Sequence, residues 1–180
     1  MAPSSVHYFL RVGSNTHVGG QARRLSRYRR ALVVFILGLV LSGLTAFPLA
    51  AETSAFAGFL GIRDPSAFAD LHGLRYWIAF VAFGLHQTYA QFPFFGYVSD
   101  WLGFAHLVIA CFFVLPLIDP QRYRGVLNAG LLACAGVCVV ALVCGAIREI
   151  PWGWRLVDCS FGVLGAILLL YCLRLTDRMD

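Results

Sequence analysis

The stretch that decides the fold is RRLSRYRR at residues 23–30, followed directly by ALVVFILGLVLSGLTAFPLA at residues 31–50. The first segment is strongly basic, and the second contains no charged residue. About 20 residues at about 1.5 Å each cross a hydrocarbon core about 30 Å thick. Arginines beside a membrane span mark its cytoplasmic side. We therefore expect an uncleaved span with a cytoplasmic N-terminus, since the apolar segment of a signal peptide is shorter.

The composition of the whole chain agrees with a membrane protein. Of its 180 residues 59% are hydrophobic and 13% are charged, whereas soluble domains average about 45–50% and about 25%. Too few charged groups exist to cover a soluble enzyme, and the apolar content excludes disorder for most of the chain. All 14 basic residues are arginine, and the net charge is +5. Because the arginines adjoin apolar runs, they indicate membrane topology and not a nucleic-acid partner.

Three further apolar runs follow, at residues 101–118, 125–147 and 156–173. Asp119-Pro120 ends the first of them, because proline interrupts a helix and disfavours helical backbone at the residue before it. Pro151 suits the start of the last one. We predict an all-α integral membrane helical bundle with two parts. Residues 1–30 form a cytoplasmic arginine-rich arm that lies on anionic headgroups, and residues 31–180 form the transmembrane domain.

Residues 76–98, YWIAFVAFGLHQTYAQFPFFGYV, leave two topologies open. If this segment is an interfacial or re-entrant helix, the protein has four transmembrane helices, and ten arginines lie inside against four outside. If the segment crosses the membrane, the protein has five spans, with eight arginines inside and six outside. The positive-inside rule therefore favours four spans, with both termini cytoplasmic and five spans as the alternative. The aromatic residues of the segment suit the headgroup level.

In the four-span topology several polar residues gather on the non-cytoplasmic side. His106 lies about 9 Å below Asp100 along its helix, and Asp158 lies about 9 Å below Trp152. Charged residues inside a membrane usually face the helical bundle and pair. We therefore predict that His106 and Asp158 face one another or share a water. Asp158 also has a potential partner one turn away, at Arg155.

These residues define a candidate site. As a catalytic hypothesis, His106 is the general acid or base and Asp158 orients it. The candidate substrate-binding residues are Asp100, Arg148, Arg155, His86 and Tyr89, with Arg148 or Arg155 as the anion clamp. Structural alternatives stay open: Asp100 as the N-cap of a helix beginning at Trp101, the arginines as interface charges, and the His106–Asp158 pair as a polar clasp.

The six cysteines all fall in or at the ends of apolar runs: Cys111, Cys134, Cys138, Cys144, Cys159 and Cys172. We interpret them as small, polarizable side chains that pack between helices. Gly130, Cys134 and Cys138 form a stripe of small residues that suits close helix packing. Gly162 and Gly165 leave the last helix without side chains at two positions, where another helix can approach closely. A disulfide between Cys144 and Cys159 is conceivable in an oxidising compartment. Zinc, phosphate-loop and nucleophile-elbow motifs are absent from the sequence, so we expect no metal and no cofactor.

Two resemblances concern residues 92–166. The segments YVSDWLGFAHLVIA and IREIPWGWRLVDCSFGVLG resemble a group of small uncharacterised bacterial multi-span membrane proteins. The chain is also similar to the VanZ-like family, which is linked to glycopeptide tolerance. That resemblance aligns Asp100 and His106 with an Asp and a His at the head of one span. It aligns Arg155, Asp158, Gly162 and Gly165 with a pattern in the last span. The Asp and His are further apart here than in the family, its Asn after the late Asp is absent, and so is its Glu/Gln pair.

Together these features predict a bacterial inner-membrane protein that binds, and in an enzymatic version modifies, a lipid or lipid-linked amphiphile. The site expected for it is a polar cleft in the outer leaflet, roofed by residues 76–98. Membrane lipid is the expected partner. Two alternatives stay open: a non-catalytic accessory or assembly subunit of a membrane complex, and a small-solute transporter that works as a homo-oligomer. Whether the protein is an enzyme is left open by the sequence.

Overall fold

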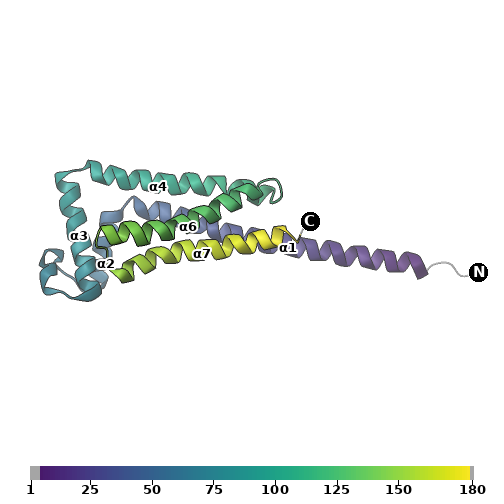
Figure 1. Cartoon of the computed structure of the whole chain (residues 1–180), viewed down its shortest axis with the longest axis horizontal. Coiled ribbons are helices and arrows are strands. Elements are labelled where there is room, and N and C mark those ends of the chain that lie inside the picture. Colours follow the sequence, from purple (N-terminus) through teal and green to yellow (C-terminus); the bar gives the residue numbers. More distant parts are fainter. Residues whose placement is uncertain (1–4, 179–180) are drawn as a thin grey trace, which may run out of the picture. The chain divides into compact units, whose positions relative to one another are not determined.

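The computed structural model describes residues 5–178, with side chains from residue 19 onward. It is 86% helical, and the described part of the chain contains no strand (Figure 1). Along the chain the elements are α1 (Ser5–Ala46), α2 (Leu49–Phe59), the short 3-10 helix η1 (Pro65–Asp70), α3 (Gly73–Gln91), α4 (Phe94–Phe112), α5 (Val114–Ile118), α6 (Arg124–Ile147) and α7 (Trp152–Thr176).

Four helical segments among the described residues are long and apolar enough to cross a membrane: Gly19–Ala46, Phe94–Ile118, Arg124–Ile147 and Trp152–Thr176. At most 28% of the residues in each apolar window are buried inside the protein. Most apolar side chains therefore point outward, as lipid-facing residues do. The predicted all-α class with four transmembrane helices is confirmed, and α3 is a separate helix that does not meet these criteria.

Two spans begin earlier than the apolar runs suggested. The second begins at Phe94, directly after Pro93, and the last begins at Trp152, directly after Pro151. A proline residue has no backbone N–H to donate, so it fits the edge of a helix better than its interior. At the other end, α1 continues without a break through residue 30. The arginine-rich segment and the first span therefore belong to one helix.

The chain divides into two compact units. The terminal unit combines α1 up to Leu37 with the chain from Phe112 onward, and the central unit comprises Gly38–Cys111. In the terminal unit Tyr28 is fully buried, and its hydroxyl donates to the Pro116 carbonyl at 2.8 Å. Phe35 packs edge-on against Phe113, with ring centroids 4.7 Å apart. These contacts join α1 to α5.

Helices α6 and α7 run side by side in the terminal unit (Figure 1). Their contact depends on small residues, as the sequence predicted. A Cβ atom added at Gly162 would lie 2.6 Å from the Cys134 carbonyl oxygen, and one added at Gly165 would lie 2.9 Å from the Cys134 Sγ. A Cβ at Gly130 would lie 2.8 Å from Leu169. At Gly162 the obstacle is the backbone of α6 itself, whereas at Gly165 and Gly130 it is packed side chains, so a larger residue at any of the three positions would force a rearrangement.

In the central unit the end of α1 crosses α4 at a second glycine contact. A Cβ at Gly43 would lie 2.9 Å from the Gly103 carbonyl oxygen, and a Cβ at Gly103 would lie 2.7 Å from Phe47. The segment after α2 turns through η1, where the Asp64 carboxylate accepts from the Ser66 N–H at 2.9 Å and the Ser66 hydroxyl at 2.6 Å. This turn leads into α3, which together with α4 forms the site described next.

Candidate functional site

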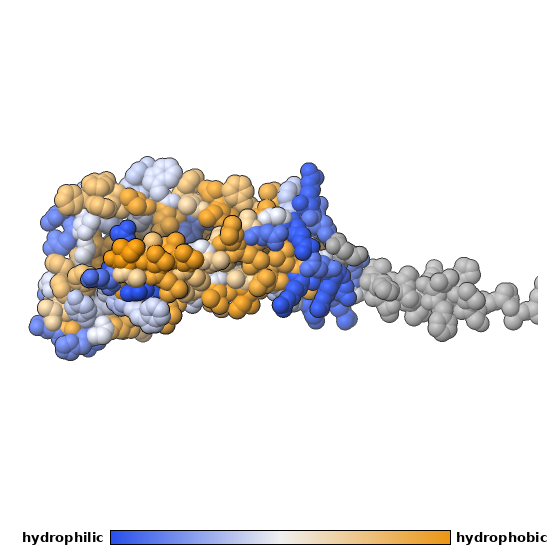
Figure 2. Space-filling model, in the orientation of Figure 1, coloured by the Kyte–Doolittle hydropathy of each residue, from blue (hydrophilic) through white to orange (hydrophobic). Residues whose placement is uncertain are grey.

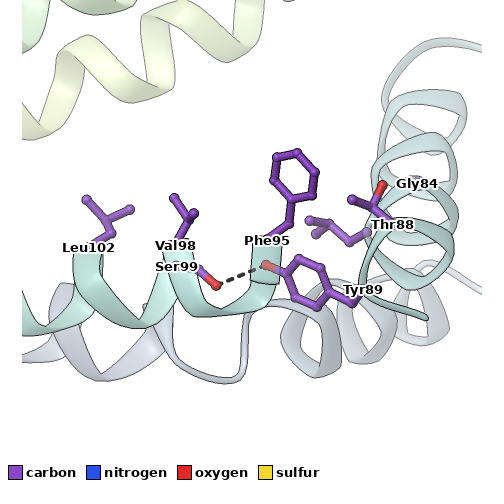
Figure 3. A pocket seen from close by; sticks show the side chains of 8 residues that line it. Gly84, Thr88, Tyr89, Phe95, Val98, Ser99 and Leu102 are labelled. Carbon is purple, nitrogen blue, oxygen red and sulfur yellow. Dashed lines mark hydrogen bonds between the residues drawn. The ribbon is translucent and has the colours of Figure 1, made fainter. Parts of the chain in front are cut away.

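A hollow of about 410 Å³ lies between α3 and α4 in the central unit (Figure 3). Its walls are almost entirely apolar, and it is open to its surroundings. Four residues of α3 and four of α4 line it: Gly84, Leu85, Thr88, Tyr89, Phe95, Val98, Ser99 and Leu102. The chain bends at Phe92-Pro93, because Phe92 has left the helical region at φ −135° and ψ 77°. The bend turns the last two turns of α3 toward the first three of α4.

The bend is held by a chain of hydroxyl groups at the edge of the hollow. The Ser99 hydroxyl donates to the Gly96 carbonyl at 2.7 Å. Its single hydrogen is therefore used, so Tyr89 is the donor in the 3.0 Å bond between the Tyr89 and Ser99 hydroxyls. The Tyr89 ring also lies over Gly96, where a Cβ would meet it at 3.6 Å. In this arrangement the Tyr89 oxygen keeps its acceptor lone pairs for a ligand.

Thr88 is a second polar contact point in the hollow. Figure 3 shows its side chain, with its oxygen, on the α3 wall of the hollow. Within residues 19–178 no group forms a hydrogen bond to this hydroxyl. The hollow therefore combines an apolar wall with one acceptor, at Tyr89, and one group, at Thr88, that can both donate and accept. This is the usual composition of a small-molecule site, in which a few polar groups orient a largely apolar ligand.

His86, also on α3, has a polar partner outside the hollow. Its Nε2 lies 3.1 Å from the Ser54 hydroxyl of α2. Ser54 donates its own hydrogen to the Ala50 carbonyl at 2.8 Å, so His86 must be the donor in this pair. The geometry is thus that of a structural link between α2 and α3. An activated nucleophile would instead donate its hydrogen to an unprotonated nitrogen.

His106 lies on α4, and its Nδ1 is 2.8 Å from the Leu102 carbonyl of the same helix. A carbonyl oxygen only accepts, so Nδ1 carries the hydrogen, and the neutral ring presents an unprotonated Nε2. That nitrogen is the one able to act as a base. Asp100 lies in the second turn of the same helix, because α4 begins at Phe94. The alternative that Asp100 caps a helix beginning at Trp101 is therefore wrong.

The remaining predicted residues belong to the terminal unit. Arg155 Nε donates to the Ile150 carbonyl at 2.6 Å, and its guanidinium lies 5.6 Å from the Trp152 ring centroid. Among the described residues Arg155 forms no ion pair with Asp158. Arg148 is exposed at the end of α6.

Arg155 acts as a clamp on the turn between α6 and α7. Glu149 reverses the chain there with a left-handed φ of 56°, and the N–H of Ile150 donates to the Gly145 carbonyl at 2.9 Å. The stem of Arg155 packs on Gly145, where a Cβ would lie 3.0 Å from Arg155 Cδ. The role expected for this arginine as an anion clamp stays a prediction, and its observed contacts are structural.

The structure brings only part of the predicted site together. Of the candidate substrate-binding residues, Tyr89 lines the hollow, whereas His86 and Asp100 do not. His106 and Asp158 belong to different units, and their facing one another stays a prediction. The sequence patterns did not single out Ser54 and Ser99, whose hydroxyls bond to His86 and Tyr89, or Thr88, which lines the hollow. Polar residues on both sides of Pro93 could have indicated this site. A proline there breaks the helix, and the break can bring the residues before it opposite the residues after it.

The cysteines are all free thiols. Cys159 faces Cys138 across the α6–α7 contact, with each Sγ directed at the other residue's carbonyl oxygen at 3.7 and 3.9 Å. This arrangement does not agree with a Cys144–Cys159 disulfide. Among residues 19–178 no group of three His, Cys, Asp or Glu side chains could hold a metal ion.

Comparison with known proteins leaves the site to be interpreted from its own chemistry. No protein-family model, no curated protein and no solved structure matches this chain.

Proposed function

We propose that this membrane protein binds an amphiphile whose hydrocarbon part occupies the α3–α4 hollow and whose polar part contacts Tyr89 and Thr88. The observation that carries the proposal is the hollow itself, of about 410 Å³, with apolar walls and a hydroxyl pair at its edge. Its volume lies within the range of small-molecule sites. Membrane lipid or a lipid-linked precursor is the ligand class with this division into apolar and polar parts.

The setting that we propose is the bacterial inner membrane with a cytoplasmic N-terminus. The charges of the terminal unit support this orientation. One end of the α6–α7 hairpin carries four arginines, Arg122, Arg124, Arg174 and Arg178, and the other end carries two, Arg148 and Arg155. Under the positive-inside rule the arginine-rich end is cytoplasmic, and the α6–α7 turn lies outside.

An enzymatic version of the proposal assigns the reaction to His106. Its Nε2 is free to accept a proton because Nδ1 donates to Leu102. A general base needs this tautomer and a substrate proton within hydrogen-bond reach. His106 does not line the hollow. Binding of the amphiphile in the hollow therefore does not require His106. The proposal for binding therefore stands independently of the catalytic one.

The test fills the hollow without disturbing the helix. Gly84 lines the hollow, and a Cβ there meets nothing within 4 Å, so Gly84→Leu projects a side chain into open space. Gly58 on α2 is a matched helical glycine, also with nothing within 4 Å of an added Cβ and outside the hollow. Both substitutions favour helix by about 0.5–1 kcal/mol, so folding is not the variable.

The measurement is native mass spectrometry of the gently purified full-length protein, followed by identification of the bound lipids. We expect wild type and Gly58→Leu to retain the same amphiphile, and Gly84→Leu to lose most of it. Tyr89→Phe keeps the volume but removes the hydroxyl, so we expect it to lose discrimination between headgroups and to keep the bound hydrocarbon. Equal retention by the Gly84→Leu and Gly58→Leu variants would refute the proposal.

A further inference from the structure

Nine arginines of the terminal unit, here called the arginine collar, gather from three separate parts of the chain: Arg23, Arg24, Arg27, Arg29, Arg30, Arg122, Arg124, Arg174 and Arg178. The contacts of α1 show that they belong together. Arg24 donates to the Arg178 carbonyl, and the Cys172 thiol points at the Tyr28 carbonyl at 3.8 Å. Arg124, at the start of α6, forms an ion pair with Asp177 at the end of α7.

The positive charge of the collar is largely unpaired. Asp119 and Asp177 are the only acidic residues in the described parts of these segments, residues 19–30, 119–124 and 174–178. Asp177 is already paired with Arg124. Arg23, Arg27, Arg29 and Arg174 are exposed, and within residues 19–178 none of them has a protein partner. This surface is therefore a concentration of guanidinium groups with donors left over for an anionic ligand.

The neighbours of the collar indicate what kind of anion it meets. Figure 2 shows the hydrophilic band of this unit bordering its apolar surface. Val33, Val34 and Leu37 follow the arginines on α1 and are 39–56% exposed, and Leu170 precedes Arg174 on α7 with 44% exposure. Side chains like these face lipid tails. A nucleic acid would have to bind beside the hydrocarbon region, whereas phospholipid headgroups lie at this level already.

We propose that the arginine collar is a binding site for anionic phospholipid headgroups of the leaflet that it borders. The guanidinium group suits this ligand, because its planar donors match two phosphate oxygens at once. The chain contains arginine and no lysine, so the exposed collar residues without a protein partner among the described residues, Arg23, Arg27, Arg29 and Arg174, can all bind in this bidentate way. The inference depends on the membrane location and is independent of the α3–α4 hollow.

The experiment compares two pairs of exposed arginines that have the same charge. Arg23→Gln/Arg27→Gln removes two unpaired cations from the collar, and Arg63→Gln/Arg75→Gln removes two exposed cations from the central unit. Glutamine keeps a helix propensity close to that of arginine. Helical content measured by circular dichroism confirms that each variant is folded. A third variant, Arg23→Lys/Arg27→Lys, restores the charge without the planar fork.

The readout is the ratio of bound phosphatidylglycerol to bound phosphatidylcholine with identical acyl chains, measured by native mass spectrometry at low salt from mixed micelles. Each arginine near an anionic surface contributes about fivefold, so we expect the collar pair to reduce the ratio by about 25-fold and the control pair to leave it unchanged. We expect the lysine variant to recover part of the ratio.

Three results would overturn the proposal. The first is an equal loss in the two glutamine pairs, since the effect would then follow net charge alone. The second is complete displacement of the bound phosphatidylglycerol by excess inorganic phosphate, which would indicate a free-phosphate site. The third is tight binding of a short RNA by the solubilised protein together with no lipid preference. A Gly84→Leu protein that keeps the phosphatidylglycerol preference but loses its amphiphile would separate the collar from the hollow.

Discussion

Gly162 on α7 is the position at which the packing of the terminal unit can be tested most directly. A Cβ added there would lie 2.6 Å from the Cys134 carbonyl oxygen and 3.1 Å from the Cys138 Sγ. The nearest obstacle is backbone, which has no rotamer to change. Ordinary contact begins at 3.4 Å, so Gly162→Ala requires α6 and α7 to separate by about 0.8 Å at this point.

The magnitude follows from comparison with Gly153 on the same helix. Overpacking of a close contact costs about 1–3 kcal/mol. A Cβ at Gly153 meets nothing within 4 Å, so Gly153→Ala carries no overpacking cost. Both variants exchange glycine for alanine in the same helix, so their free energies of unfolding should differ by the overpacking cost alone, about 1–3 kcal/mol, with Gly162→Ala the less stable.

Reversible unfolding in mixed micelles, titrated with sodium dodecyl sulfate and followed by circular dichroism, measures this difference. The two variants add the same methyl group to the same helix, so helix propensity cancels to first order. If Gly162→Ala is as stable as Gly153→Ala, the helix backbones do not touch at this register, and the reasoning about the small-residue contact is refuted.

Three further predictions follow from single contacts. Tyr28→Phe leaves the buried Pro116 carbonyl without its 2.8 Å hydrogen bond, and we expect the free energy of unfolding to fall by about 1–3 kcal/mol in the same titration. The hydrogen bonds from Ser66 lower the pKa of the exposed Asp64 carboxyl. The ionised Asp64 carboxylate therefore stabilises the turn at pH values above the ordinary carboxyl pKa. This stabilisation is lost as the pH falls through the lowered pKa of Asp64. Ser66→Ala should raise the Asp64 pKa toward its ordinary value in an NMR titration, and no change would contradict the assignment. For the catalytic hypothesis, His106→Ala should abolish activity while membrane insertion and abundance stay normal. Loss of the protein from the membrane would instead indicate a structural clasp.

The candidate site shows where sequence reasoning reaches its limit. Spacing along a helix suggested an Arg155–Asp158 pair, because residues three apart share a face. The structure directs Arg155 back to the Ile150 carbonyl instead. The turn before α7 leaves this carbonyl in need of a donor, and no helical spacing rule describes a turn. The Tyr89–Ser99 bond likewise depends on the bend at Pro93, whose direction is a property of the folded chain.

The sequence by itself determined the all-α class, the four long apolar helices, the small glycine and cysteine residues along α6 and α7, and the position of the arginines at the ends of apolar runs. These properties are local, because the free energy of placing a segment in a membrane is a sum over its own 20 or so residues. The tertiary structure alone decided which helix faces meet, and hence the α3–α4 hollow, the clamp at Arg155 and the union of three segments in the arginine collar. Each of these depends on the rotation of one helix about its axis relative to another. That rotation is set by the packing of side chains far apart in the chain, which no local pattern contains.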